Sequence, residues 1–352
     1  MRLATLVATL VASLICLAPL TAQDTVDDAE PALTVVERIQ AEAQLLADSV
    51  TSDLAWTFLS ETQRLPAAEA RTVHWDHQQE RYLSQREFEA LSPSPGDEYT
   101  ARELSAETYY DTKYGTPVAY SRAIEVLGAT GLEDLHGAKI LDYGYGTIGH
   151  LRLLALSGAK VVGVDVDSFL PALYSEPGDQ GPVATIDGPT GDVKLVDGSW
   201  PASAETLAAV GTGYDLFLSK NTLKRGYIHP AREVDPSSLI DMGVDDATYL
   251  SHLSELLNPG GLALIYNICP PQGGADEPYV PWADGRSPFT EQQWQAAGFE
   301  LLAFDVDDTE AVRDMGELLG WGDATEMQNF FAWYTLARRG DSLRADTFLP
   351  GG

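Results

Sequence analysis

The amino-acid sequence predicts an α/β protein: a doubly wound, mostly parallel sheet of seven strands with helices on both faces, preceded by a mainly helical extension. Three observations predict this fold class. Short apolar runs, typical of strands buried on both faces, alternate with helix-like stretches between residues 138 and 337. A glycine-rich turn joins the first run to the helix-like stretch that follows. The 352 residues, 44% of them hydrophobic, suffice for one large core with an added subdomain.

The stretch 138–167 contains the strongest motif. Its first apolar run, Ala138–Tyr143, ends at Gly144, Gly146 and Gly149, which have the spacing G-x-G-x-x-G. The first glycine allows a tight turn, the second lets the backbone approach a ligand, and the third permits close packing of helix on strand. The sequence therefore predicts a strand, a ligand-binding turn and a helix in that order.

A second strand follows this helix. Leucines at near-helical spacing continue to Gly158, which ends the helix, and Val161–Val164 is the next apolar run. Asp165 stands at the carboxyl end of that run, where a carboxylate can accept hydrogen bonds from two ribose hydroxyls. These positions imply a ligand that contains a nucleoside.

Asp142 distinguishes between two kinds of nucleoside ligand. Dinucleotide-binding dehydrogenases share the glycines and have an acidic residue about 20 positions further on. A carboxylate two residues before Gly144 would repel the pyrophosphate of NAD, whereas it would attract a ligand that carries an ammonium and a sulfonium group. The turn is therefore expected to bind a nucleoside without phosphates.

The segment Ile140–Gly149, an apolar pair followed by D-x-G-x-G-x-x-G, resembles the first motif of the class I S-adenosylmethionine-dependent methyltransferases. The resemblance extends over residues 106–339 and implies the Rossmann-like fold of that family, an antiparallel last pair of strands, and S-adenosyl-L-methionine as cofactor. It implies that Asp142 and the glycines cradle the methionine part and that Asp165 holds the ribose. The full set of cofactor-binding residues that it implies is Asp142, Gly144, Tyr145, Gly146, Gly149, Asp165, Val166, Asp197 and Gly198.

The remaining elements follow in chain order. Further strands are predicted over Val193–Asp197, Tyr214–Ser219, Leu262–Ile268, Glu300–Val306 and Phe330–Ala337. Helices are predicted over Asp245–Leu257, from Thr290 up to Gly298, and over Thr309–Leu319. The long connection Pro171–Pro189 is expected to be a surface excursion. In the family, the acidic residue at the end of the third strand contacts the adenine amino group; here that residue is Asp197, and Trp200 is a candidate neighbour.

Candidates for the acceptor side follow the fourth predicted strand. In open α/β sheets the ligand lies beyond the carboxyl ends of the strands. Lys220, Asn221, Tyr227 and His229 are therefore candidate catalytic residues, for positioning the acceptor or removing a proton, although each also fits a hydrated loop side chain. The branch of the family that methylates amino groups has an acidic or amide residue, two prolines and an aromatic residue here. Lys220–Leu223 differs from that pattern, so methylation of nucleic acid or of ring nitrogens is not expected.

The charge balance argues against two classes of partner. Lys+Arg number 22 against 53 Asp+Glu, a formal net charge of −31, which disfavours nucleic acid and anionic membrane surfaces. A heavily solvated acidic surface explains the charge, and a cationic substrate is the alternative explanation. The expected partner is therefore a small-molecule substrate, and the acidic surface would favour a cationic one.

Residues 1–22 have the pattern of a secretory signal peptide: Arg2, an apolar run over Leu3–Leu20, and small residues up to Ala22. An uncleaved membrane anchor is the alternative, because the run is just long enough to span a bilayer. The acidic residues from Asp24 onward place the body of the protein outside the cytoplasm, in the periplasm or the medium, with no stable membrane partner after cleavage. This expectation conflicts with a cofactor that is made inside cells.

Residues 23–105 are expected to form an acidic linker and the mainly helical extension, and residues 340–352 a loose tail. One or two helices are predicted over Leu33–Leu59, and a small hairpin fits Arg71–Ser84.

Metal and thiol chemistry are not predicted. His74 and His77 flank Asp76, but no third and fourth ligands stand at a recognisable spacing. Cys269 is interpreted as a small buried residue rather than a nucleophile.

The expected activity is methyl transfer from S-adenosyl-L-methionine to an unidentified small-molecule acceptor by in-line displacement, with a neutral thioether as leaving group. An exported, non-catalytic binding protein that keeps the fold is one alternative, although the intact set of Asp142, Gly144, Gly146 and Asp165 argues against it. An NAD-dependent oxidoreductase is the other, and Asp142 disfavours it.

Overall fold

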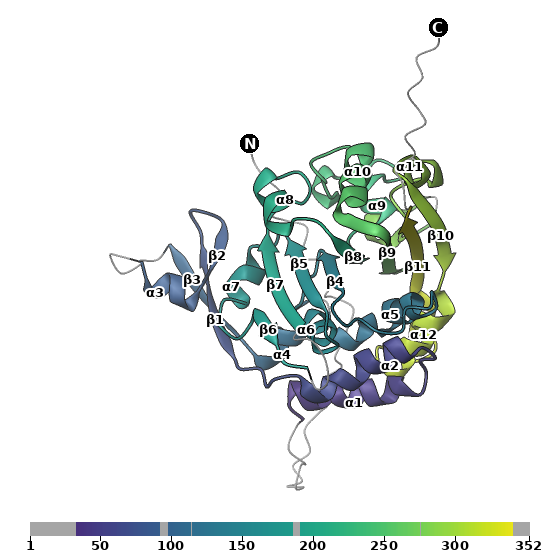
Figure 1. Cartoon of the computed structure of the whole chain (residues 1–352). Helices are drawn as coiled ribbons and strands as arrows, with labels where there is room; N and C mark the ends of the chain where they lie inside the picture. The colour runs from purple at the N-terminus through teal and green to yellow at the C-terminus, as the bar shows by residue number, and fades with distance from the viewer. Residues whose placement is uncertain (1–32, 92–97, 114, 186–190, 275, 341–352) are drawn as a thin grey trace.

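The centre of the protein is a sheet with the strand order β10-β11-β9-β8-β4-β5-β7-β6, in a computed structural model that describes residues 33–91, 98–113, 115–185, 191–274 and 276–340 (Figure 1). Its strands are β4 Lys139–Tyr143, β5 Lys160–Asp165, β6 Gly181–Val183, β7 Gly191–Asp197, β8 Tyr214–Lys220, β9 Leu257–Cys269, β10 Phe299–Asp307 and β11 Phe331–Arg339. Neighbouring strands from β7 to β9 are parallel, whereas β11 is antiparallel to both β9 and β10. The predicted mostly parallel sheet with an antiparallel last pair is confirmed.

Two strands differ from the prediction. The sheet has an eighth strand, because β6 in the connection Pro171–Pro189 pairs antiparallel with β7 at the sheet edge. β9 begins at Leu257 rather than Leu262, since the Pro-Gly-Gly segment continues the strand through a shift of register against β8 instead of turning.

Helices cover both faces of the sheet. Successive strand residues enter two separate hydrophobic clusters, with Ile140 and Leu216 in one and Leu141 and Phe217 in the other. The helices are α4 Ala106–Asp111, α5 Ser121–Gly128, α6 Gly149–Leu156, α7 Phe169–Leu173, α8 Ala204–Val210, α9 Arg225–Ile228, α10 Asp246–Leu256, α11 Glu291–Ala296 and α12 Thr309–Leu318, with 3-10 turns η2 Pro117–Tyr120, η3 Pro236–Ser238, η4 Pro281–Ala283 and η5 Glu326–Asn329. In Figure 1, α10 and α11 lie above the sheet and α5, α6 and α12 lie below it.

The extension ahead of the sheet contains helices and a small sheet. Its elements are α1 Val35–Ala47, α2 Asp53–Ser60, η1 Glu61–Arg64, β1 Arg71–Asp76, β2 Arg81–Ser84, α3 Gln85–Glu89 and β3 Tyr99–Leu104. Two helices lie in the stretch for which one or two were predicted, the predicted β1–β2 hairpin is present, and β3 adds an unpredicted third strand on the other side of β1. Glu125 of α5 fixes α2 against the sheet domain, because its carboxylate accepts hydrogen bonds from the backbone N–H groups of Thr51 and Ser52 just before that helix.

The start of β7 packs directly on α6. A Cβ at Gly191 would collide with the backbone carbonyl of Ala155, which cannot rotate away as a side chain would. Gly191→Ala is therefore expected to lower the free energy of unfolding by about 2–3 kcal/mol, as overpacking a core does. Urea denaturation measures this. Gly178→Ala is the control, because nothing lies within 4 Å of the added carbon; equal midpoints for the two variants would contradict the packing.

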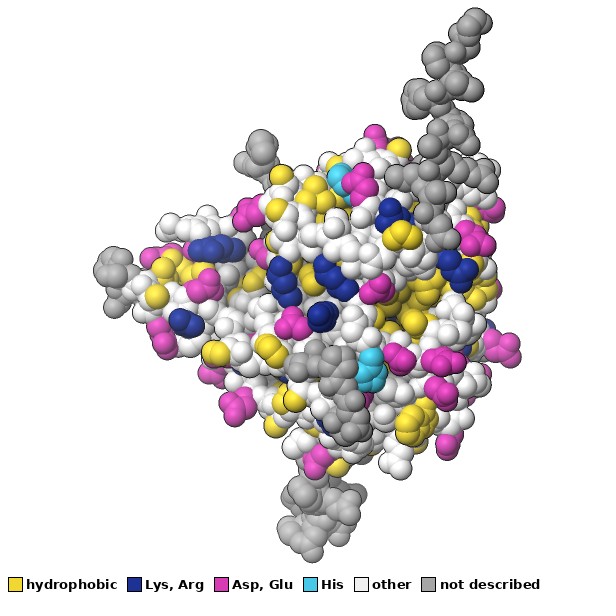
Figure 2. Space-filling view, in the orientation of Figure 1, with side chains coloured by type: hydrophobic (Ala, Val, Ile, Leu, Met, Phe, Trp, Pro, Cys, Tyr) yellow, Lys and Arg dark blue, Asp and Glu magenta, His cyan; other side chains and the backbone are white. Residues whose placement is uncertain are grey.

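Acidic side chains are spread over the visible face (Figure 2), in keeping with the net charge of −31. In the described part of the chain, no helix has the length and apolarity needed to cross a bilayer. The predicted leader and linker up to residue 32, and the tail after Gly340, lie outside the described residues. Export and the domain boundaries at 105 and 339 therefore stay predictions.

Candidate functional site

The carboxyl ends of neighbouring strands form the edge at which the motif residues meet. Asp142 pairs with Leu218 across β4 and β8, and the register of β4 with β5 ends one residue before Gly144 and Asp165. Continuing both registers puts Gly144 level with Asp165 on one side and with Lys220 on the other. From β4 the chain proceeds to β5 and β7 in one direction, and β8 and β9 lie in the other direction. This is the topological switch point at which open α/β sheets bind ligands.

The glycine-rich turn has the backbone that the motif predicts. Gly144 and Gly146 take φ values of 74° and 56°, which favour glycine. A Cβ at Gly144 would collide with the side chain of Thr222 from the segment after β8, so this glycine also makes room for that segment. A Cβ at Gly149 would lie 2.7 Å from Pro117, so the third glycine serves close packing against η2, whereas the motif predicts close packing against a strand.

Asp142 is fully buried at the end of β4. Its Oδ2 lies 3.1 Å from Nε2 of His150 in α6, whereas its Oδ1 has no hydrogen-bond partner among the described residues. A buried polar atom without a partner costs about 1–3 kcal/mol. A donor such as the ammonium group of a ligand would therefore be stabilised at Oδ1.

His150 connects Asp142 to an aromatic ring and a lysine. The imidazole is fully buried and stacks on Tyr120, with ring centroids 3.6 Å apart and an angle of 6° between the planes. Nζ of Lys220 lies 4.8 Å from the centroid of the same Tyr120 ring. Asp142, His150, Tyr120 and Lys220 thus form one contiguous group at the switch point, and no sequence motif predicts it.

Asp165 ties the two turns that follow β4 and β5. Its Oδ2 accepts the backbone N–H of Gly146 at 3.1 Å, and its Oδ1 accepts those of Val166 and Asp167 at 2.8 and 3.1 Å. A carboxylate has about four acceptor positions, so roughly one remains, at Oδ2, for an incoming hydroxyl. The resemblance implies hydrogen bonds from two ribose hydroxyls. The second hydroxyl would have to share an acceptor position with one of the three backbone N–H groups.

Nucleoside binding is expected to weaken as the pH falls through 6. Burial raises the pKa of the half-buried Asp165 carboxyl to about 6, although its backbone donors oppose the shift. Because a ribose hydroxyl donates best to the ionised carboxylate, the dissociation constant for S-adenosylhomocysteine should rise about tenfold between pH 7 and pH 5. Calorimetric titration at both pH values checks this. Asp165→Asn should remove the pH dependence, and a flat profile for the unmodified protein would contradict the assignment.

The predicted adenine side of the site lies beside Asp165. Asp197 at the end of β7 is its partner in the sheet register and is exposed. Val166, which follows Asp165, is 68% exposed and presents an apolar side chain at this edge. The backbone N–H of Gly198 donates to the carbonyl of Asp165 at 2.9 Å, which holds the ends of β5 and β7 together.

Two aromatic residues point into the core instead of toward the site. The side chain of Tyr145 is 2% exposed and lies in the hydrophobic cluster near Tyr174, so only its backbone could contact a cofactor. Trp200 is also buried and packs against Tyr143 and Tyr249; its interpretation as an adenine neighbour stays a prediction.

Two lysines are buried at the end of β8 and just after it. Lys220 is a predicted site residue, whereas Lys224 was not predicted. Burial lowers the pKa of each ammonium to about 8. Asn221 has φ of 65°, and its Oδ1 accepts the backbone N–H of Ile268 at 2.7 Å, so its amide joins the ends of β8 and β9. This bond leaves Asn221 fixed at the site edge.

The other two predicted acceptor-side residues lie further along the chain. Tyr227 is half-buried, with its ring centroid 5.8 Å from Nζ of Lys224, and burial raises the pKa of its hydroxyl to about 12. The side chain of His229 is 47% exposed and pairs with Asp246 of α10 at 2.9 Å. Tyr227 thus lies near the buried lysines, whereas the contacts of His229 are with α10. Their catalytic roles stay predictions.

The histidines of the small sheet have structural partners. His74 lies 2.7 Å from Oε1 of Gln85 and stacks on Phe88, and His77 lies 2.7 Å from the hydroxyl of Thr100. Within the described ranges, no group of three or more His, Cys, Asp or Glu residues could hold a metal ion.

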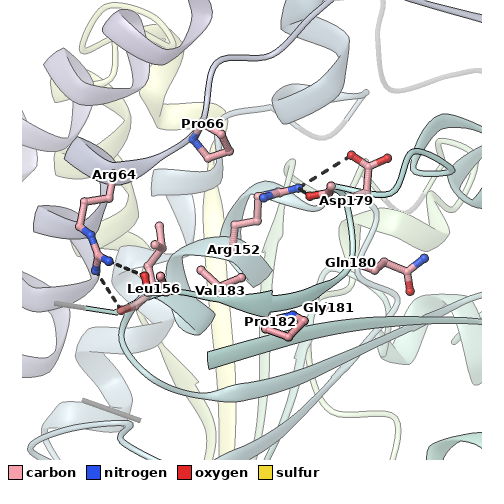
Figure 3. A pocket seen from close by; sticks show the side chains of 11 residues that line it. Arg64, Pro66, Arg152, Leu156, Asp179, Gln180, Gly181, Pro182 and Val183 are labelled. Carbon is pink, nitrogen blue, oxygen red and sulfur yellow. Dashed lines mark hydrogen bonds and ion pairs between the residues drawn. The ribbon is translucent and has the colours of Figure 1, made fainter. Parts of the chain in front are cut away.

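Two hollows in the surface lie away from the glycine-rich turn. One, of about 230 Å³, is bordered by η1, α6 and β6, where Arg64 bonds the carbonyls of Leu156 and Ala184 and Arg152 faces Asp179 (Figure 3). The other, of about 460 Å³, lies between α5 and the strands β10 and β11. The guanidinium groups of Arg64 and Arg152 both contact protein carbonyl groups at this hollow.

Comparisons with known proteins concern the fold. No family model matches the chain, and no curated protein matches its sequence. Among solved structures, cyclopropane synthase MmaA2 of Mycobacterium tuberculosis is 15% identical with a TM-score of 0.38, over 89% of this chain and 100% of that one. Phosphoethanolamine N-methyltransferase 2 of Haemonchus contortus, in complex with phosphomonomethylethanolamine and S-adenosylhomocysteine, is 16% identical with a TM-score of 0.40. The match covers 69% of this chain and 63% of that one. The cyclase SpnF is 15% identical with a TM-score of 0.36, and the match covers 63% of this chain and 83% of that one.

Several of the matching structures are S-adenosylmethionine-dependent methyltransferases, which is the family that the turn 140–149 resembles. At identities of 14–18% the likeness extends to the fold alone. TM-scores below 0.5 give these neighbours no weight in assigning an activity. The proposed activity therefore depends on the residues of the site.

Proposed function

We propose that this protein is an S-adenosylmethionine-dependent methyltransferase that acts on a small-molecule acceptor. The observation that carries the proposal is the buried Oδ1 of Asp142, which lacks a hydrogen-bond partner among the described residues at the start of the glycine-rich turn. A ligand ammonium would satisfy this oxygen and pair with its charge. A pyrophosphate in the same place would meet a buried negative charge and be repelled.

The neighbouring strand ends fit the rest of the cofactor. Asp165 retains about one acceptor position for a ribose hydroxyl, beside the turn that its Oδ2 already holds through Gly146. Exposed Val166 offers an apolar surface for an adenine ring, and Asp197 a carboxylate for the adenine amino group. These residues would hold the cofactor along β4, β5 and β7, which leaves the ends of β8 and β9 for the acceptor.

The residues on the acceptor side restrict the space around the reacting atoms. When bound, S-adenosylmethionine supplies a methyl group on a sulfonium, open to in-line attack by the acceptor. Orientation of two bound reactants can supply about 7–11 kcal/mol of the barrier reduction. The segment around η4 is fixed to α9 by the ion pair of Arg225 with Asp284 at 2.8 Å. On this proposal the segment would help to exclude water from the acceptor side.

Ligand-dependent thermal unfolding tests the proposal. S-adenosylhomocysteine at 100 times its dissociation constant should stabilise the folded protein by about 2.7 kcal/mol. NAD⁺ at the same concentration serves as the comparison and should leave the midpoint unchanged. A shift with NAD⁺ and none with S-adenosylhomocysteine would favour the oxidoreductase alternative and remove the methyltransferase assignment.

A further inference from the structure

Lys220 is a buried cation without a hydrogen bond to any described residue. The residue is 8% exposed, and its Nζ lies over the face of the Tyr120 ring, 4.8 Å from the ring centroid. A ring face attracts an ammonium group, but it cannot accept hydrogen bonds from all three of its N–H donors. A charge that is largely withdrawn from water is stabilised by a compensating partner.

Lys224, the second buried lysine, has protein partners. Its Nζ donates to the carbonyl of Ile268 at 2.7 Å and to that of Trp282 at 3.2 Å. These bonds join the end of β9 to η4. The N–H donors of Lys224 are thus engaged by the protein, and Lys220 is the lysine of the pair that has N–H donors left for a ligand.

The charges around Lys220 leave a positive excess. The charges that act on it are those of Lys224, which repels it, and Asp142, which attracts it. The carboxylate of Asp142 also contacts His150, so the attraction of Lys220 to this one carboxylate is opposed by the ammonium group of Lys224. This part of the edge is basic, although the whole chain has a net charge of −31. The acidic residues Asp165 and Asp197 lie on the opposite side of the glycine-rich turn, toward β5 and β7.

We infer that the methyl acceptor carries an anionic group, a carboxylate or a phosphate, and that the ammonium group of Lys220 binds it. The anion would complete the hydrogen bonding of Nζ and supply the missing negative charge at the end of β8. The inference rests on the proposed function for the neighbouring cofactor site, and it replaces the cationic substrate that the overall charge allowed. Long-range repulsion by the acidic surface would slow the entry of such a substrate, but the buried lysine would decide which small molecules are retained.

Anion titration of the protein saturated with S-adenosylhomocysteine tests this inference. Acetate and inorganic phosphate are the probes, acetamide is the neutral comparison, and tryptophan fluorescence or calorimetry reports binding at constant ionic strength. At least one anion is expected to bind with a dissociation constant in the millimolar range, and acetamide at least about 10-fold more weakly. Lys220→Met should weaken the anion at least about 10-fold. Lys160→Met, which removes an exposed lysine from the other end of β5, should leave the affinity unchanged.

Three outcomes would overturn the inference. The first is equal binding of acetate and acetamide by the unmodified protein, which needs no variant to be folded. The second is anion affinity that Lys220→Met leaves intact. The third is a Lys220→Met variant that loses S-adenosylhomocysteine but keeps 5′-methylthioadenosine, because this would assign Lys220 to the cofactor carboxylate. Failure of the unmodified protein to bind S-adenosylhomocysteine would instead refute the proposed function, and titration of the unliganded protein would still test Lys220.

Discussion

Asp165→Ala is expected to weaken the binding of S-adenosylhomocysteine about 100-fold, the largest single effect at this site. Hydrogen bonds to a charged group contribute about 1.5–3 kcal/mol, or roughly 10–100-fold in affinity. The substitution also releases the backbone N–H groups of Gly146, Val166 and Asp167 that the carboxylate holds, so the glycine-rich turn keeps only its backbone bond from Gly144 to Val164 of β5. Calorimetric titration measures the change.

Two further variants separate the causes. Asp165→Asn keeps an acceptor for the turn and removes the charge, so its loss should be intermediate, about tenfold. Asp134→Ala removes a carboxylate whose side chain is 69% exposed, and it should bind as the unmodified protein does. Unchanged affinity of a folded Asp165→Ala variant would mean that the nucleoside does not lie at the end of β5.

Asp142→Asn is expected to separate the two halves of the ligand. Its carboxylate is proposed to hold the ammonium of the methionine part, and 5′-methylthioadenosine has the same adenosine and thioether without that part. The variant should therefore bind S-adenosylhomocysteine about 10–100-fold more weakly and 5′-methylthioadenosine with unchanged affinity. Titration of both ligands into both proteins gives the comparison directly.

The thermal stability of Asp142→Asn serves as its control. An amide at this position still faces Nε2 of His150. It also removes the buried negative charge of a carboxylate whose Oδ1 has no hydrogen-bond partner among the described residues. The variant should thus unfold at about the same temperature as the unmodified protein. Equal weakening of both ligands, or a large loss of stability, would show that Asp142 acts through the structure of the turn rather than through the ammonium.

The sequence predicts the central sheet well because its strands are buried runs with clear ends. β8, for example, was expected over Tyr214–Ser219 and ends one residue later, at Lys220. The αβ order around the glycine-rich turn followed in the same way from Gly149 and Gly158, which begin and terminate α6. These features are local, so the pattern of apolar residues contains most of the information.

The strands that were not predicted have no local signal. β3, with the sequence YTAREL, has mostly exposed side chains and is held by pairing with β1. β6 is three residues long and contains Pro182, which an edge strand tolerates. In both strands the partner in the sheet determines the conformation, and that partner cannot be read from the strand itself.

The candidate site was predictable only where a motif fixes a backbone. Asp142, Gly144, Gly146 and Asp165 meet as expected because one turn and two adjacent strands place them. His150 was missed although it follows Gly149 directly, in a helix of otherwise mainly apolar residues; that polar residue was the available signal. Its stacking on Tyr120 and the burial of Lys224 depend on residues far away in the chain. The inward orientation of Tyr145 likewise follows from its tertiary packing.

Calorimetric titration of S-adenosylmethionine into the protein at pH 7.5 tests the central claim most directly. We expect one site per chain with a dissociation constant in the micromolar range, which corresponds to about −8 kcal/mol at 1 μM. We also expect the affinity to be greatly reduced in Asp165→Ala. A folded protein that gives no heat of binding with S-adenosylmethionine or with S-adenosylhomocysteine would contradict the assignment and leave a non-catalytic protein with a methyltransferase-like fold.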